Sequence, residues 1–272
     1  MFYITRIINF SAMHSYHVVE WSKEKNEQVF GACSNPHGHG HDFKLEVTVK
    51  GKLARESGVV VNTVDIKQIV GSFVAEELDG KFLNKEHPYF KKHVPTLENI
   101  IIYLWDAIAP KLSNCILFRL RLHENHYLFS EKEEGSLVTF SRRYHFSAAH
   151  RLHSAALSDE ENRRLFGKCN NYYGHGHNYY LDVCVKGEPD PITGMVIDLT
   201  YLDEIVESVI LDKFDHKHLN LDTSEFENLN PTSEMFAMVI YNLLSPYIPN
   251  LHKIGLWETE NNYFEYFGPE GE

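Results

Sequence analysis

The fold of this chain is decided by two neighbouring segments, FSAAHRL at residues 146–152 and LFGKCNNYYGHGHN at residues 165–178. The second segment holds His175 and His177 one glycine apart, and residues two apart in a strand point to the same side of the sheet. His150 ends the apolar strand pattern of the first segment. Three neutral imidazoles from adjacent strands, with no fourth protein ligand in the pattern, predict a catalytic zinc site with one open coordination position.

The same pattern occurs twice in the 272 residues, at an offset of 136. FSAMH at residues 10–14 returns as FSAAH, and FGACSNPHGHGHDF at residues 30–43 returns as FGKCNNYYGHGHNY. Such an internal repeat predicts two tandem domains, residues 1–136 and residues 137–272, each large enough to bury its own core. The charged run that contains Gly135 marks the boundary.

The composition narrows the class of protein. With 43% hydrophobic and 24% charged residues, the chain is typical of globular soluble proteins. A net charge of -12 argues against a general nucleic-acid surface, so any bound phosphate needs a local cationic pocket. No apolar run approaches the roughly 18 residues of a membrane span, and we expect no membrane partner. Four cysteines are too few for a secreted disulfide framework, so we expect a reduced, cytoplasmic protein.

Hydrophobic periodicity predicts the same order of elements in both copies: strand, strand, helix, helix, strand, strand. Apolar residues alternate up to His14 and again after His41, which places these histidines on the buried face of an antiparallel strand pair. The second helix of each copy is expected to begin at Thr96 or Thr232, whose hydroxyl can cap free N–H groups. We therefore predict an α+β fold, in which each domain has an antiparallel four-stranded sheet with two helices on one face.

The first copy repeats the histidine pattern as His14, His39 and His41. A single histidine is most often an ordinary surface or core residue. The recurrence of the whole set at one offset, each time at the end of an apolar strand face, favours a metal site. We expect Zn²⁺ at both triads.

Four other residues of the second copy suggest chemistry. Cys169 lies in a polar loop six residues before His175, where a nearby metal or cationic imidazole would favour the thiolate, although most lone cysteines are buried apolar residues. Asp215 and His216 form a base if the carboxylate orients the ring, or are merely a turn after a helix. Glu258 lies among apolar strand residues and suits a donor-rich ligand edge, or is an exposed edge-strand charge.

Together these residues resemble the 6-pyruvoyltetrahydropterin synthase family of zinc enzymes, which have the tunnelling fold, or T-fold. The resemblance covers nearly all of residues 138–268 and is looser over residues 2–130. Its motifs are FSAAHRL, LSDEEN, LFGKCNN, GHGHNY, DPITGMVIDL, FDHKHLN, PTSE and WETENN.

The resemblance implies a role for each matched residue. Zinc would be held by the triad of the second copy, and Cys169 would be the proton-abstracting thiolate. Asp215 and His216 would complete its relay, and Glu258 would anchor the pterin ring. Thr232 and Glu234 would be further pterin contacts. The implied reaction, which belongs to tetrahydrobiopterin biosynthesis, eliminates triphosphate from 7,8-dihydroneopterin triphosphate and rearranges its side chain to a diketone.

Two alternatives stay open. The family also contains 6-carboxytetrahydropterin synthase of queuosine biosynthesis, which shares these groups but typically has a shorter spacing between cysteine and histidine than the five residues between Cys169 and His175. The chain could also bind a pterin without turnover. Arg142, Arg143 and Lys168 are candidates for the triphosphate, with no geometric reason to choose among them.

The first copy departs from the family pattern. It keeps the triad, Cys33 and Asp79, but Gly80 replaces the relay histidine, and the offset of 136 puts Leu122 in place of the glutamate. We expect it to bind zinc without forming a complete site of its own. The resemblance also implies a homo-oligomer with active sites at subunit or domain interfaces.

Overall fold

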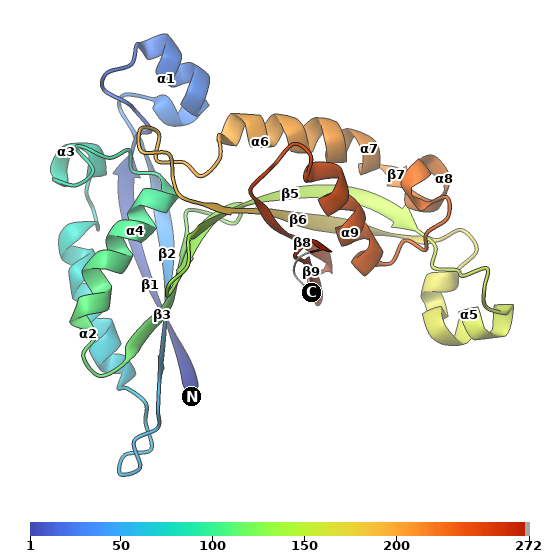
Figure 1. The fold of residues 1–272 in the computed structure, drawn as a ribbon, viewed down its shortest axis with the longest axis horizontal. Helices are drawn as coiled ribbons and strands as arrows, with labels where there is room; N and C mark the ends of the chain where they lie inside the picture. Colours follow the sequence, from blue (N-terminus) through green and yellow to red (C-terminus); the bar gives the residue numbers. More distant parts are fainter. Residues whose placement is uncertain (270–272) are drawn as a thin grey trace. The chain divides into compact units, whose positions relative to one another are not determined.

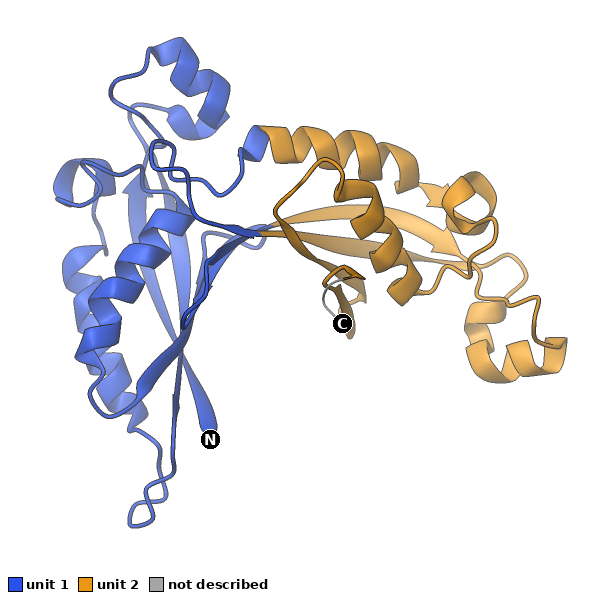
Figure 2. Cartoon of the chain, in the orientation of Figure 1, with its two compact units in different colours: residues 1–141, 186–200 blue, residues 142–185, 201–272 orange. Residues whose placement is uncertain are grey.

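The structure is a computed structural model, which describes residues 1–269. The chain divides into two compact units (Figure 2). The N-terminal unit contains residues 1–141 and residues 186–200, and the C-terminal unit contains residues 142–185 and the chain from residue 201 onward. The predicted domain boundary at residue 136 remains a prediction, because these units are defined by compactness rather than by the repeat.

The N-terminal unit is built on four antiparallel strands in the order β1-β2-β3-β4 (Figure 1). Their bounds are Phe2–His14 for β1, His39–Gly51 for β2, Ile116–His123 for β3 and Leu128–Glu133 for β4. In the β1–β2 ladder, His14 is opposite His39 and Ala12 is opposite His41. This register brings all three predicted ligands of the first copy to one end of the strand pair.

Helices of this unit are placed by capping residues and apolar stripes. The element α2 (Thr63–Glu77) begins after Asn62, and α4 (Leu97–Ile108) begins after Thr96, whose hydroxyl accepts from Asn99 N–H as predicted. Both helices bury one stripe in the core with the inner face of the sheet. The short helices are α1 (Lys23–Phe30) and α3 (Leu83–Glu86).

The C-terminal unit repeats this plan, with strands in the order β5-β6-β8-β9. Its strands are β5 (Val138–His150), β6 (His175–Gly187), β8 (Leu251–Thr259) and β9 (Asn262–Tyr266), and the short β7 (Lys217–His218) pairs with β5 in parallel. Its helices are α5 (Asp159–Phe166), α6 (Leu199–Val206), α7 (Asp212–Phe214), α8 (Leu219–Asp222) and α9 (Ser233–Leu244). A π-helical segment, Glu207–Leu211, joins α6 to α7.

Aromatic side chains fill the core of the C-terminal unit. Phe236 on α9 has ring contacts with Phe146, Tyr179, Phe214 and Phe226, at centroid distances between 5.0 and 5.8 Å. Such edge-to-face packing stabilises a core beyond its buried area. It fixes α9 against the strands that present the histidines.

The connection between β6 and α6 belongs to the N-terminal unit, although the repeat in the sequence assigns it to the second copy (Figure 2). Met195 is buried there with Tyr16, Val18, Phe30 and Val94. The sequence does not predict that residues 186–200 pack in the N-terminal unit, because this connection has the composition of an ordinary loop.

The predicted fold class is confirmed: each repeat has an antiparallel four-stranded sheet with helices, in an α+β arrangement. The predicted order of elements does not include the short helices α1, α3, α5, α7 and α8 or the short strand β7. The four residues of α3 and of α8 are too few to show a helical period. Within residues 1–269, no helix combines the length and the apolar character that a membrane span needs.

Candidate metal and catalytic site

The histidine triad of the C-terminal unit converges at the adjoining ends of β5 and β6. The ring centroid of His150 lies 4.6 Å from that of His175 and 5.2 Å from that of His177. His150 Nδ1 lies 2.7 Å from the carbonyl oxygen of Pro231, so the hydrogen bond places the proton on Nδ1 and directs Nε2 toward His175. The two Nε2 atoms are 3.2 Å apart.

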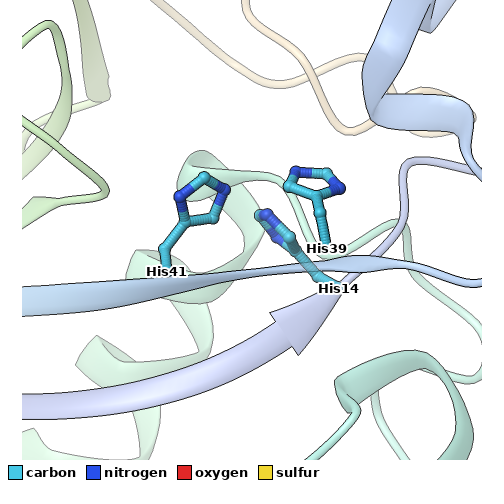
Figure 3. Close-up of side chains that lie close together, drawn as sticks. All are labelled: His14, His39 and His41. Atoms are coloured by element: carbon cyan, nitrogen blue, oxygen red, sulfur yellow. The ribbon is translucent and has the colours of Figure 1, made fainter.

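The triad of the N-terminal unit has nearly the same geometry (Figure 3). His14 rises from β1, and His39 and His41 rise from β2, with their rings gathered on one side of the strands. The centroid of His14 lies 4.6 Å from that of His39 and 5.1 Å from that of His41. His14 Nδ1 lies 2.9 Å from the carbonyl oxygen of Pro95, the counterpart of Pro231.

Burial favours the neutral form of five of the six imidazoles, those of His14, His39, His41, His150 and His175. Burial, together with the neighbouring histidines, lowers the pKa of His150 to about 4 and that of His14 to about 3. The pKa values of His39, His41 and His175 are lowered as well, again mainly by burial. A neutral imidazole is the form that binds a metal ion.

Both triads fit a divalent metal ion. In each, one ligand atom per histidine can be chosen so that all three lie within 4.8 Å of one another. Nε2 of His14, His41 and His177 is buried without a hydrogen-bond partner, a costly arrangement that a metal would relieve. The 3.2 Å between the Nε2 atoms of His150 and His175 is near the roughly 3.3 Å that tetrahedral Zn–N bonds of about 2.0–2.1 Å require.

Glu258 on β8 lies beside the triad of the C-terminal unit. Its Oε1 is 3.7 Å from Nε2 of His150 and 3.8 Å from Nε2 of His177. The hydroxyl of Ser233 donates to Oε1 at 2.9 Å, and the amide of Asn262 donates to Oε2 at 3.3 Å. Two donors therefore hold the carboxylate in place, and neither was predicted from the sequence.

The N-terminal unit keeps a glutamate at the same place, which corrects the expectation that Leu122 replaces it. Glu124 lies 3.8 Å from Nε2 of His14 and 3.4 Å from Nε2 of His41. In the strand ladders, Leu45 is opposite Leu122 and Leu181 is opposite Leu256, so the copies differ by 134 residues here. The first copy has two extra residues between α4 and β3, and a fixed offset of 136 therefore fails in this region.

A family model described as 6-pyruvoyl tetrahydropterin synthase matches the chain twice, at residues 3–134 and at residues 139–269. The chain belongs to this family. The two repeats are accordingly tandem T-fold domains.

Individual relatives match about half of the chain. The human 6-pyruvoyl tetrahydrobiopterin synthase is 48% identical over 130 residues, which are 47% of this chain and 90% of that protein. The solved structure of the Caenorhabditis elegans 6-pyruvoyl tetrahydropterin synthase is 45% identical and covers 48% of this chain and 96% of its own, with a TM-score of 0.47. A putative 6-carboxy-5,6,7,8-tetrahydropterin synthase of Archaeoglobus fulgidus is 37% identical over 93 residues, which are 34% of this chain and 73% of that protein.

Cys169 lies in a short 3-10 turn, Gly167–Asn170, that follows α5. Its carbonyl oxygen accepts from Leu152 N–H at 2.9 Å, which fastens the turn two residues beyond His150. Its thiol is half-buried and free. The backbone of Cys169 is therefore held beside the end of β5, the strand that supplies His150.

Asp215 and His216 form a pair, with 2.9 Å between Asp215 Oδ2 and His216 Nδ1. Burial alone would raise the pKa of Asp215, but hydrogen bonds from Ser147 N–H and His216 hold it below its ordinary value. His216 is 83% exposed, and no hydrogen bond within residues 1–269 joins it to Cys169. The relay between Cys169 and the Asp215–His216 pair therefore stays a prediction.

The backbone of His216 has φ = 57°, and it is the one non-glycine residue within residues 1–269 with a positive φ. This conformation costs a side-chain-bearing residue about 1–3 kcal/mol. Gly80, its counterpart in the first copy, has φ = 72°, which glycine adopts freely. Strained backbone of this kind clusters at functional sites in proteins, so His216 stays a candidate site residue.

Thr232 and Glu234 lie at the start of α9, where the Thr232 hydroxyl accepts from Met235 N–H. Thr232 is half-buried and Glu234 is exposed. Their counterparts Thr96 and Glu98 are 0% and 2% exposed, because the connection at residues 186–200 covers them. Thr96 donates its hydroxyl to Gly194 O at 2.7 Å, and Glu98 Oε1 accepts from Val196 N–H at 3.0 Å.

Of the three cations considered for the triphosphate, two are already paired. Arg142 forms two hydrogen bonds with Asp203, and Arg143 forms two with Asp182. Lys168 is exposed beside Cys169. Among these three, Lys168 alone remains a candidate.

Proposed function

We propose that the chain is a zinc-dependent 6-pyruvoyltetrahydropterin synthase whose C-terminal repeat carries out turnover. The observation that carries this proposal is the placement of Glu258 Oε1 within 3.8 Å of Nε2 of both His150 and His177, in a chain whose family is established. The substrate would be 7,8-dihydroneopterin triphosphate. Its side chain would face the metal while its pterin ring meets the carboxylate.

The residues of the C-terminal repeat would divide the work as follows. Glu258, held by Ser233 and Asn262, would accept hydrogen bonds from the donor edge of the pterin and so fix the side chain against the triad. Thr232 and Glu234 would add contacts at the start of α9. When bound to His150, His175 and His177, zinc would supply a Lewis acid that makes the C–H bonds beside the substrate's side-chain oxygens more acidic.

Proton transfer would rest on Cys169, Asp215 and His216. Cys169 as thiolate would take a proton from the side chain as triphosphate leaves, and the exposed His216 would exchange protons under the orienting influence of Asp215. Because no hydrogen bond joins Cys169 to His216 within residues 1–269, we infer that relay groups meet Cys169 across an interface.

A homo-oligomer with active sites at such interfaces would supply the missing contact. The strand β1 pairs with β2 on one side, and its side chains Phe2, Tyr3 and Ile7 are each at least 51% exposed. An exposed apolar edge strand is a template for pairing with another chain. Within residues 1–269 none of the four cysteines forms a disulfide, which supports a reducing, cytoplasmic setting.

A second candidate is 6-carboxytetrahydropterin synthase, which the match to the Archaeoglobus fulgidus relative favours. The five residues between Cys169 and His175 support the pyruvoyl-forming reaction instead. A chain that binds pterin without turnover is the third outcome.

One experiment separates the three. Purified, zinc-loaded protein is incubated with 7,8-dihydroneopterin triphosphate, and triphosphate release is followed with and without a chelator, while mass spectrometry identifies the pterin. We expect chelator-sensitive release and a 6-pyruvoyl product. A 6-carboxy product would select the second candidate, and binding without release would refute turnover.

A further inference from the structure

A cavity of about 770 Å³ lies at the ends of β5 and β6 that carry the histidine triad of the C-terminal unit. Arg151 and His153 line it from the chain after β5, Tyr172 and Tyr173 line it from the turn before β6, and residues of the segment 218–230 line the rest. A concave space of this volume is typical of sites for small molecules. None of the residues assigned above to the metal, the thiol, the relay or the pterin lines it.

Arg151 brings a permanent positive charge into this cavity. In contrast to Arg142 and Arg143, it forms no ion pair within residues 1–269, and its buried Nε has no hydrogen-bond partner there. One terminal nitrogen, Nη2, donates to Asn170 Oδ1 at 3.1 Å, and the guanidinium lies 5.4 Å from the ring centroid of Tyr172. These contacts hold the side chain in place and leave N–H groups of its fork free. A fixed guanidinium fork of this kind suits bidentate binding of a phosphate.

The corresponding place in the N-terminal repeat has no such cation. The residues that correspond to Arg151, Ser154, His218 and Asn230 are Ser15, Val18, Phe82 and Val94. Val18 and Val94 pack with Met195 in an apolar cluster, and Ser15 is 3% exposed. The cationic cavity therefore belongs to the repeat that keeps the full set of candidate catalytic residues.

The cavity borders the candidate site through two backbone segments. Arg151 contacts Asn170, the neighbour of Cys169, in the turn that Leu152 N–H fastens to the end of β5. On the other side, a Cβ added to Gly174 would lie 2.8 Å from Nε2 of His218, so the His218 ring lies against the residue before the ligand His175. The cavity is thus next to both the thiol-bearing turn and the metal ligands.

The charges around the cavity favour an anion. Besides Arg151, the lining includes His153 and His218, whose rings offer further N–H donors. Glu227 is the one carboxylate among the lining residues, and it is exposed. Since the whole chain has a net charge of -12, a polyanion needs such a local concentration of positive charge and donors.

We propose that this cavity receives the triphosphate of the substrate and that the guanidinium of Arg151 is its cationic anchor. The inference rests on the proposed function, since it places the leaving group of that reaction. As the C–O bond to triphosphate breaks, negative charge grows on the departing oxygen, and a cation already fixed in place stabilises that charge. The N-terminal repeat, with Ser15 in place of Arg151, has no equivalent anchor.

The test separates the triphosphate from the rest of the substrate. Zinc-loaded chain is titrated calorimetrically with inorganic triphosphate and, separately, with 7,8-dihydroneopterin, which has the pterin ring and side chain but no phosphate. Arg151→Gln should weaken triphosphate binding by about 10-fold or more, and raise KM for 7,8-dihydroneopterin triphosphate by a similar factor, because charge-assisted hydrogen bonds are lost. Its affinity for 7,8-dihydroneopterin should equal that of the wild type.

Two further variants serve as controls. Arg151→Lys keeps the charge without the fork, so its loss of triphosphate affinity should be smaller than that of Arg151→Gln. Arg163→Gln removes an exposed arginine of α5 and should leave triphosphate binding and KM unchanged. Zinc content, measured for each variant after the titration, checks that the metal centres remain folded and that triphosphate has not removed the metal.

The outcomes distinguish this inference from the proposed function. Triphosphate binding that Arg151→Gln leaves unchanged would overturn the anchor. Equal losses of affinity for triphosphate and for 7,8-dihydroneopterin would overturn it as well, because they would show that Arg151 only holds the turn of Cys169. Arg151-dependent binding of triphosphate by a wild type that releases none from the substrate would support the anion site and reject the proposed function alone.

Discussion

Replacing Glu98 by glutamine should stabilise the N-terminal unit in a pH-dependent way. Glu98 is 2% exposed, and burial raises its pKa from the ordinary 4.5 to about 7, against hydrogen bonds from Val196 N–H and other donors that lower it. When the pKa of an acid is higher in the folded state than in the unfolded state, its contribution to the free energy of unfolding is fully present below the unfolded-state pKa. This contribution is lost as the pH rises through the folded-state pKa. The relevant window is therefore pH 4.5 to about 7.

The magnitude follows from these two values. Ionising Glu98 in the folded chain costs about 3 kcal/mol at pH 8 and about 1 kcal/mol at pH 5, relative to an unperturbed glutamate. Glutamine removes the ionisation and keeps a carbonyl oxygen for Val196 N–H. The stability gained by Glu98→Gln should therefore grow by about 2 kcal/mol between pH 5 and pH 8.

Urea unfolding followed by tryptophan fluorescence measures this gain. In a Trp257→Phe background, the remaining Trp21 and Trp105 both lie in the N-terminal unit, so the signal reports that unit. Glu234→Gln is the matched control, because Glu234 is the exposed counterpart and its change should stay within about 0.5 kcal/mol at both pH values. An equal gain at pH 5 and pH 8, or a loss at pH 8, would refute the reasoning.

Three further substitutions probe catalysis, the core and the turn before the ligands. Cys169→Ala should lower the rate of triphosphate release by about 10²-fold or more, whereas Cys33→Ala should leave it intact, and equal losses would contradict a single active repeat. Phe236 is 0% exposed, and Phe236→Ala should lower the free energy of unfolding by about 3–5 kcal/mol. The control Leu165→Ala, at an exposed residue, should lower it by less than about 0.5 kcal/mol. Similar small losses for both variants would show that the aromatic core is not tightly packed. Gly174 has φ = 75°, and an added Cβ would lie 2.6 Å from His150 O, so Gly174→Ala should weaken zinc retention against a competing chelator, while Gly135→Ala, with open space around its Cβ, should not.

Much of the site was predictable because period-two patterning fixes which strand residues share a face. His14, His39 and His41 are where alternation places them, and the capping role of Thr96 follows from its position before an apolar helical stripe. These features depend on local chain geometry alone.

Other features depended on contacts that the sequence does not encode locally. Glu124 was missed because two extra residues before β3 shift the repeat, and only the strand ladder reveals the new register. The burial of Glu98 was missed because residues 186–200, which follow β6 of the second repeat, pack in the N-terminal unit and cover Glu98 there. The strained φ of His216 also has no sequence signal of its own.

The zinc content per chain, measured by inductively coupled plasma mass spectrometry after exhaustive dialysis, tests the central claim most directly. The claim is that each repeat carries its own three-histidine metal site. We predict two zinc ions in the wild type, one in His175→Ala, one in His39→Ala and none in the double variant. A wild type that retains no zinc, or a single variant that loses both ions, would contradict it.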